Sequence, residues 1–549
     1  MKGTPDTAAL ASCPAADTVT LIARRALHCA DGESLAGLES PFRLGPLDQL
    51  VLPFVPIAVV FLYRKPTSGA SSSELLPMER LARALALLLD YYPHLTGRLQ
   101  INPSDKTPEI SQLGTGAELF IAQCSERLDT FCPSLYAGEE QHATGRILMK
   151  DLPAAGNALL APFDPTLEGV CRDPIFVVQH TRFACGGVAL GVRLHHIVCD
   201  ADGFFRLVHD LAEIYRGVRA SETKGDPSSG IGVLARPPHI RSYLWELWDM
   251  TPEERQAALD VQPAHYYVES SDHAAVVAAE GASTSAAEPP ASAVPPAQPP
   301  VIGRVLRFSG RELDALKAHA TDPSGGSWVS TFEALSAHLY QSVYRARLWL
   351  RTAQGVPLSA AVSEVSREFL TSVNWRGRDR LDLPPRYFPN ACFIPYSGLP
   401  HDVLADGPLW QVAKALHDWT RALSPEKARQ TLRWIAAQPD KTRVKIDFCF
   451  QNSFMVSQWC KFDMYVGVDF DVDEHGEAVL PALVGPPFTP ILLVDGLAYF
   501  LATEEQLQGG TAPQSIDVNL ALSEPLWAIL DQDEGFRQFH IMAVFNKEK

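Results

Sequence analysis

The chain has 549 residues, of which 46% are hydrophobic and 20% charged, proportions typical of a folded soluble protein. Sixty-four acidic against 47 basic residues give a formal net charge of −17, which disfavours nucleic acid and anionic membranes as partners because their phosphates would be repelled. The cysteines are scattered without any C-x-x-C pair, so we expect neither a disulfide framework nor a zinc cluster, and a cytoplasmic location fits best. The most apolar stretch, Leu50–Tyr63, is interrupted by two prolines and is too short to span a bilayer, so no integral membrane segment is expected.

The N-terminal half mixes helical and strand periodicities. Leucines from Leu81 to Leu89 lie at helical spacing and predict a helix that ends before Pro93. The alternation of apolar residues over 188–194 predicts a half-buried strand. An apolar stripe over 204–214 then predicts a helix that ends at Gly217.

The C-terminal half shows the same mixture. Ser330 and Glu333 form a capping-box pattern, which predicts a helix reaching roughly Arg347. Strand-like runs follow around Ala360 and over 444–450 and 491–501. Because strands and helices interleave throughout, the predicted fold class is α/β or α+β.

A linker divides the chain. Over 270–300, 21 of 31 residues are Ala, Pro or Ser, a composition with little apolar surface to bury. We therefore predict an N-terminal domain over 1–220, a crossover over 221–300 that contains this linker, and a C-terminal domain over 301–549.

The segment R-L-H-H-I-V-C-D-A-D-G-F-F begins at Arg193 and places His196 and Asp200 at H-x-x-x-D spacing where the predicted strand turns into a helix. A histidine there could accept a proton near neutral pH, and the aspartate could orient its imidazole or pair with a distant arginine. The spacing alone carries little weight, since about one such pair is expected by chance in a chain of this composition. Adjacent strand residues face opposite sides, so His195 is expected in the core, and a metal site built from both histidines is disfavoured.

Six segments, in order along the chain, resemble motifs of the BAHD family of acyl-CoA-dependent acyltransferases. They are Leu44–Asp48 (L-G-P-L-D), Phe61–Tyr63, the helix and Y-Y-P-H-L-T-G-R-L stretch over Leu81–Leu99, His195–Gly203, Ser330–Arg347, and Val373–Arg378 with Pro384–Asn390 (V-N-W-R-G-R and P-P-R-Y-F-P-N). A second family signature, D-F-G-W-G, is altered: the nearest match, over 469–473, reads D-F-D-V-D and lacks both glycines.

The resemblance implies two chloramphenicol-acetyltransferase-like domains, with mixed sheets flanked by helices, joined by a long crossover. It implies that His196 is the general base and that Asp200 pairs with Arg376 to support it. Ser457 and Trp459 become tentative substrate-binding residues, as an oxyanion donor and a wall of the acceptor pocket, beside the alternative that they are ordinary strand residues. No bound cofactor or metal is implied, acyl-CoA is the co-substrate, and the family is usually monomeric.

The implied activity is acyl transfer from an acyl-CoA such as acetyl-CoA to a hydroxyl group of a small or amphipathic acceptor. The long Ala/Pro/Ser-rich crossover and the H-H-x-x-x-D-A-D-G-F-F form look more like fungal than plant members, which points to a secondary metabolite such as a mannosylerythritol glycolipid. The alternatives are a trichothecene-like terpenoid O-acetyltransferase, an N-acyltransferase, a carrier-protein condensation enzyme, and a non-catalytic protein that binds a metabolite.

Overall fold

The computed structural model describes the chain in a set of ranges. These are residues 18–66, 74–131, 146–224, 233–242, 249–269, 299–326, 328–377, 379–446, 448, 450, 452–509, 514–539 and 541–542. Nearly all of the predicted linker, 270–298, lies outside the described residues.

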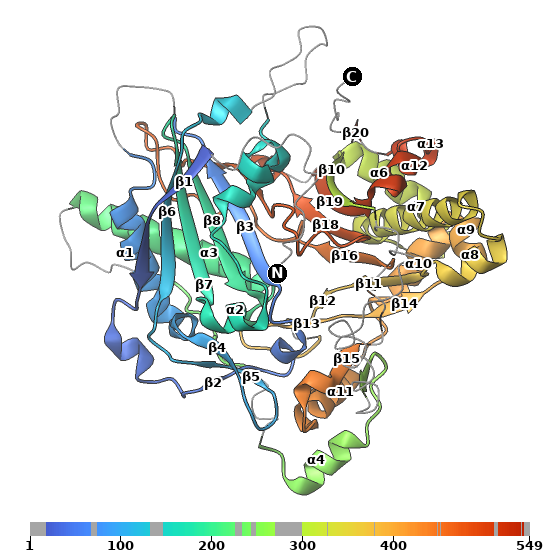
Figure 1. Ribbon diagram of the computed structural model, residues 1–549, viewed down its shortest axis with the longest axis horizontal. Coiled ribbons are helices and arrows are strands. Elements are labelled where there is room, and N and C mark those ends of the chain that lie inside the picture. The colour runs from blue at the N-terminus through green and yellow to red at the C-terminus, as the bar shows by residue number, and fades with distance from the viewer. Residues whose placement is uncertain are drawn as a thin grey trace, which may run out of the picture.

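Two mixed sheets lie side by side (Figure 1). In spatial order, the first contains β1 (Val19–Leu27), β6 (Ala117–Cys124), β7 (Phe176–Phe183), β8 (Val188–His195), β3 (Pro56–Tyr63) and β17 (Pro481–Gly485). The second contains β14 (Tyr396–Gly398), β11 (Glu368–Thr371), β16 (Phe454–Gln458), β18 (Leu497–Ala502), β19 (Ile516–Ser523), β10 (Val301–Phe308) and β20 (Ile541–Met542). Each sheet combines parallel and antiparallel pairs, so the predicted mixed α/β class is confirmed.

The central strands of the first sheet are buried on both faces, whereas the edge strand β1 is largely exposed. Alternate residues of β3 divide between two cores: Val59 and Phe61 pack toward α1 (Met78–Tyr91) and α3 (Ala201–Lys224), while Val60 packs against segment 147–159 on the other face. This alternation follows from the pleat of a strand, which turns successive side chains to opposite faces.

The second sheet is covered by helices that include α7 (Thr331–Ala353) and α10 (Leu409–Trp419). The shorter helices of this half are α6 (Gly310–His319), α8 (Leu358–Glu364), α9 (His401–Ala405), α12 (Glu524–Leu530) and α13 (Glu534–Arg537). Ser330 and Glu333 form the predicted capping box, and α7 extends beyond the expected Arg347 to Ala353.

Three small sheets and three further helices complete the described fold. The sheets pair β2 (Phe42–Arg43) and β4 (Arg98–Ile101) with β5 (Pro108–Ser111), β12 (Val373–Asn374) with β13 (Cys392–Phe393), and β9 (Tyr266–Val268) with β15 (Val444–Ile446). The helices are α2 (Leu167–Arg172), α4 (Pro252–Leu259) and α11 (Pro425–Ala437), and α4 lies beside α11.

The two halves of the chain are interlocked. β17 comes from the C-terminal half, yet it pairs antiparallel with β3 and completes the N-terminal sheet. In the opposite direction, β9 precedes the linker but pairs with β15 of the C-terminal half. β17 therefore lies outside the range proposed for the N-terminal domain although it completes that domain's sheet, and β9 lies within the proposed crossover.

Several elements differ from the sequence predictions. α3 continues through Gly217 to Lys224, because Arg216 beside this glycine donates to the carbonyl oxygen of Asp469 (2.7 Å) and this tertiary contact holds the helix. The run around Ala360 is helix α8 rather than a strand, since small apolar residues after Pro357 suit the first turn of a helix. The strand-like run over 444–450 is a strand only over Val444–Ile446.

Candidate active site

His196 lies at the junction of β8 and α3. β8 ends at His195, a short 3₁₀ turn covers His196–Val198, and α3 begins at Ala201. Both backbone polar groups of His196 are held: its N–H donates to the carbonyl oxygen of Val55 (3.2 Å), and its carbonyl accepts from the side-chain amide of Asn390 (3.0 Å). The backbone of this residue is therefore fixed by two distant segments of the chain.

The imidazole of His196 is half-buried. Its Nδ1 is enclosed and has no hydrogen-bond partner among the residues that the structure describes, so Nε2 is the ring nitrogen that a substrate can reach. Burial lowers the pKa of His196 below its usual value, and the carbonyl of the same residue, the Asp200 carboxylate and the Asn390 side chain oppose that shift. A lowered pKa leaves the ring neutral at pH 7, which is the form that can accept a proton.

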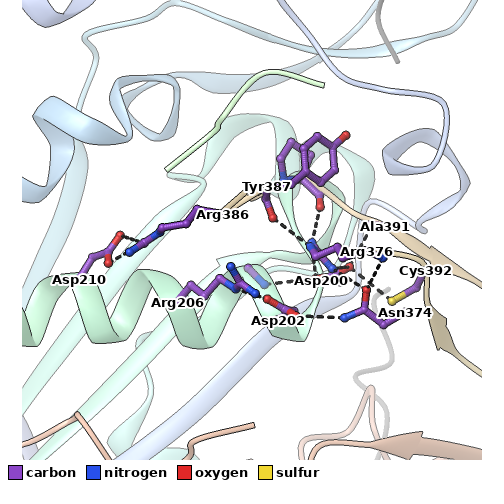
Figure 2. A network of polar contacts seen from close by, with 12 residues as sticks. Asp200, Asp202, Arg206, Asp210, Asn374, Arg376, Arg386, Tyr387, Ala391 and Cys392 are labelled. Atoms are coloured by element: carbon purple, nitrogen blue, oxygen red, sulfur yellow. Dashed lines mark hydrogen bonds and ion pairs between the residues drawn. The ribbon is translucent and has the colours of Figure 1, made fainter. Parts of the chain in front are cut away.

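Asp200 and Arg376 form a buried, two-pronged ion pair (Figure 2). Nη1 of Arg376 donates to Oδ2 (2.8 Å) and Nη2 to Oδ1 (2.9 Å), and the side chains of Asp200 and Arg376 are 5% and 10% exposed. The backbone N–H groups of Ala391 (2.9 Å) and Gly203 (3.2 Å) also donate to this carboxylate. Burial by itself raises the pKa of Asp200, but Arg376 and the N–H donors hold the pKa below its ordinary value.

Arg376 uses its whole guanidinium group in the interior. Besides Asp200, its Nε donates to the carbonyl oxygen of Tyr387 (2.9 Å), and Nη2 donates to that of Pro389 (2.6 Å). The arginine thus holds the segment 387–391 against the start of α3, with no N–H edge left for a substrate. The sequence left two roles open for Asp200, which were to orient the His196 imidazole or to pair with a distant arginine. Within the described chain Asp200 makes no hydrogen bond to the His196 ring, and the structure contains the pairing with Arg376.

Further along α3, two more carboxylates are held by the C-terminal half (Figure 2). The side-chain amide of Asn374 donates to Asp202 Oδ2 (3.0 Å) in the first turn of the helix. Two turns later, Asp210 accepts from Nη2 of Arg386 (2.6 Å) and from the hydroxyl of Tyr92 (2.6 Å). α3 is therefore fixed at its N-terminus and in its middle by residues of 374–386.

His195 is fully buried on the other side of the strand from the core that α3 covers. Its ring packs edge-on against Phe163, with 5.9 Å between ring centroids, and burial lowers its pKa to about 3. The ring is therefore neutral at any physiological pH, and it lies where a packed core histidine was expected.

Ser457 and Trp459 lie at the end of β16 in the second sheet. The indole N–H of Trp459 donates to the hydroxyl oxygen of Ser457 (3.1 Å), which directs the hydroxyl proton of the serine elsewhere. The Trp459 ring packs edge-on against Phe205 of α3 (5.6 Å) and against Tyr499 (5.1 Å). Neither Ser457 nor Trp459 makes a hydrogen bond to His196 or the ion pair in the part of the chain that the structure describes.

A cavity lies beside this pair. Its walls are formed by Pro486–Phe488, Leu492, Leu497, Tyr499, Asn519 and Ala521. Tyr499 lines this cavity, and the ring of Trp459 is in edge-on contact with the ring of Tyr499.

Asp48 and Asn390 stand inside the motifs quoted from the sequence, but no role was predicted for either of them. Asp48 is 1% exposed and accepts from both the backbone N–H and the side-chain amide of Asn390 (2.8 Å each), and Asn390 in turn holds the His196 carbonyl. The signal available in the sequence was an acidic residue in an otherwise apolar and glycine-proline stretch, L-G-P-L-D.

None of the helices in the described part of the chain is both long enough and apolar enough to cross a membrane.

The fold agrees with comparisons to known proteins. The model of the Transferase family matches residues 34–272 and 301–479, which is more than half of the chain. The chain belongs to this family, the BAHD acyl-CoA-dependent acyltransferases, and is an acyltransferase.

Individual relatives are distant. Hydroxycinnamoyltransferase 2 of Oryza sativa subsp. japonica is 26% identical over 399 residues, covering 72% of this chain and 75% of the relative. Shikimate O-hydroxycinnamoyltransferase of Nicotiana tabacum is 23% identical over 394 residues, covering 71% and 74%. Vinorine synthase shares the fold with a TM-score of 0.59 at 15% identity over 95% of this chain and 99% of its own. F. sporotrichioides TRI101 complexed with coenzyme A and T-2 gives a TM-score of 0.56 at 19% identity, covering 91% and 98%.

Proposed function

We propose that the protein transfers an acyl group from an acyl-CoA to an acceptor hydroxyl, with His196 as the general base. The observation that carries this proposal is the half-buried imidazole at the β8–α3 junction, held by its peptide on both sides and kept neutral by burial. A neutral, oriented imidazole with one accessible nitrogen is what removal of a proton from an alcohol requires.

The proposed reaction needs no covalent enzyme intermediate. Nε2 of His196 takes the proton of the acceptor hydroxyl while the oxygen attacks the thioester carbon, giving a tetrahedral oxyanion. Collapse of that intermediate forms the ester and expels the CoA thiolate, which takes the proton back from the imidazolium. Ser457 is the proposed donor to the oxyanion, because its oxygen already accepts from Trp459 and its own proton is left to donate.

Asp200 and Arg376 support the base without touching substrate. Both are buried, and they join α3 to the segment 387–391 that carries Asn390. The acyl donor and the acceptor are proposed at the level of class: an acyl-CoA, and a small or amphipathic molecule with a hydroxyl group. Acetyl transfer to a fungal glycolipid such as a mannosylerythritol lipid stays a prediction from the sequence.

The test is release of free thiol from acyl-CoA by the wild type and by His196→Ala. Acetyl-CoA and a hydroxycinnamoyl-CoA would be offered with glycolipid, terpenoid alcohol, shikimate and amine acceptors. We expect acceptor-dependent thiol release that falls about 10²–10⁴-fold in His196→Ala, the usual contribution of a general base. His475→Ala removes an exposed histidine and is the control.

The pH profile adds a second readout. Because the pKa of His196 is lowered, the loss of kcat/KM that protonation of this ring causes should come at a pH below the ordinary histidine range. Full activity in folded His196→Ala would contradict the proposal, and CoA binding without thiol release for any acceptor would favour the non-catalytic alternative. Preference for the amine acceptors would replace O-acylation by N-acylation.

A further inference from the structure

His196 depends on the N-terminal segment 44–55 through two routes. The first is direct, since the carbonyl oxygen of Val55 accepts from the His196 N–H (3.2 Å). The second passes through Asn390, whose side-chain amide donates both to Asp48 Oδ1 (2.8 Å) and to the His196 carbonyl (3.0 Å). Val55 directly, and Asp48 through Asn390, thus hold the N–H and the carbonyl group of the same residue, although they lie far from it in the sequence.

The Asp48 carboxylate is buried and is held by backbone N–H donors. The carboxylate is 1% exposed, and each of its oxygens accepts from backbone: Oδ1 from Asn390 N–H (2.8 Å) and Oδ2 from Gly45 N–H (2.7 Å). Within the described residues it has no cation in contact, and the charged group facing it is Asp200, which is itself neutralised by Arg376. A carboxylate buried without a cation is costly, so its retention points to a task that an apolar side chain could not perform.

The residues around Asn390 show what that task is. Pro389 gives its carbonyl to Arg376, Asn390 gives its N–H and side chain to Asp48, and Ala391 gives its N–H to Asp200. Three consecutive residues are therefore held by three different charged groups. The position of the Asn390 amide, which also raises the pKa of the His196 ring, is set from the Asp48 side.

We propose that Asp48 is a positioning residue of the acyl transfer, acting through the Asn390 side chain to hold the His196 backbone and align its imidazole with the acceptor hydroxyl. This inference rests on the proposed function, because it assigns Asp48 to the placement of the proposed base. A catalytic base displaced by about an ångström loses on the order of 100-fold in rate, so a positioning residue is expected to act on kcat.

Asp48→Asn is the sharpest variant. It keeps the size of the side chain, but its NH₂ group must face either Gly45 N–H or the two donors of Asn390, so at least one buried contact becomes donor against donor. We expect kcat to fall roughly 10- to 100-fold while KM for acyl-CoA changes less than about 2-fold.

The pH profile separates positioning from a structural role. Burial raises the pKa of Asp48 to about 7, with the three N–H donors opposing the shift. Protonation of the carboxyl removes acceptor capacity, so wild-type kcat should begin to fall near pH 7 and fall again when His196 is protonated. In Asp48→Asn the step near pH 7 should be absent.

A double-mutant cycle tests whether Asp48 acts on His196 through Asn390. Asn390→Ala should reproduce the kcat loss, and the double variant should lose no more than about 2-fold beyond the worse single variant, because both changes break one chain of contacts. Asp471→Asn is the matched control. Asp471 is a second buried carboxylate that accepts backbone and side-chain hydrogen bonds, and it lies far from His196 in the sequence. Its substitution should leave the pH profile unchanged.

The outcomes are distinguishable. Loss of activity in His196→Ala together with a wild-type kcat and pH profile in folded Asp48→Asn would overturn this inference and leave the proposed function intact. Full activity of His196→Ala would overturn the proposed function first. If Asp48→Asn does not fold, the pH step near 7 in the wild type and its loss in Asn390→Ala remain the deciding measurements.

Discussion

Two clusters of polar contacts join the C-terminal half of the chain to α3, and they differ in what lies beside them. The first is the pair Asp200 and Arg376 at the start of the helix, next to His196 (Figure 2). The second is the altered motif over 469–473, which contacts the last turns of the same helix: Arg216 donates to the Asp469 carbonyl (2.7 Å) and Arg219 to the Phe470 carbonyl (3.1 Å).

The altered motif gains a contact where the family signature has glycine. Asp471 accepts from the Leu76 N–H (2.9 Å) and the Tyr215 hydroxyl (3.2 Å) through Oδ2, and from Arg80 (3.3 Å) through Oδ1. The loss of the signature is thus compensated by a carboxylate that ties this segment to α1 and α3. A sequence motif can change where its contacts only stabilise the packing of neighbouring segments, whereas the residues around His196 must also position a reacting atom.

The largest expected effect follows from removing Arg376. Arg376→Ala leaves Asp200 buried without its cation and releases the carbonyls of Tyr387 and Pro389, so we expect the free energy of unfolding to drop by about 3–5 kcal/mol. Because Asn390 lies in the released segment, thiol release should collapse as well. Chemical denaturation and the thiol assay measure both effects. Arg376→Lys keeps the positive charge but cannot form both parallel hydrogen bonds, so its stability should lie between those of the wild type and Arg376→Ala. Equal stability of the lysine and alanine variants would contradict the importance of the two-pronged geometry.

A smaller effect is expected at Gly203, in the first turn of α3. A Cβ atom there would lie 2.3 Å from the carbonyl oxygen of Phe388 and 2.9 Å from Cβ of Cys199. Gly203→Ala should therefore cost roughly 1–3 kcal/mol through overpacking, although alanine by itself favours a helix. It should also lower kcat by pushing away the segment that carries Asn390. Gly37→Ala, at a site with nothing within 4 Å of the added Cβ, is the control, and a neutral or stabilising Gly203→Ala would show that 388–391 can move without consequence.

Much of this architecture is predictable from sequence where the determinants are local. The helix that ends before Pro93 and the capping box at Ser330 follow from residues a few positions apart, and α1 and α7 bear them out. Elements held by distant contacts were missed. β17 joins the N-terminal sheet by pairing with β3, and no periodicity within either segment encodes that partnership.

The candidate site likewise combines residues that could be predicted from local motifs with contacts between residues distant in the sequence. The H-x-x-x-D spacing drew attention to His196 and Asp200, and the family resemblance predicted roles for them and for Arg376, because each stands inside a motif. The role proposed for Asp48 could not be found in that way, since its contact with Asn390 joins residues 342 positions apart. Likewise, the contact between Trp459 and Tyr499 depends on the register of β16 against β18, which pairs Ser457 with Tyr499.

The smallest effects, and the ones that separate the two clusters, are expected at Asp471 and Asp469. Asp471→Asn keeps one acceptor oxygen but loses the charge that strengthens the contacts with Arg80 and Tyr215, so the free energy of unfolding should fall by about 1–2 kcal/mol. Its neighbour Asp469 is 25% exposed in its pair with Arg216, and Asp469→Asn should cost about 0.5 kcal/mol or less. Both variants should retain kcat within about 2-fold at assay temperature, because neither carboxylate touches the residues that hold His196. A large loss of kcat in folded Asp471→Asn would mean that the altered motif contributes to placing the reacting groups, and the distinction between a cohesive and a catalytic cluster on α3 would then fail.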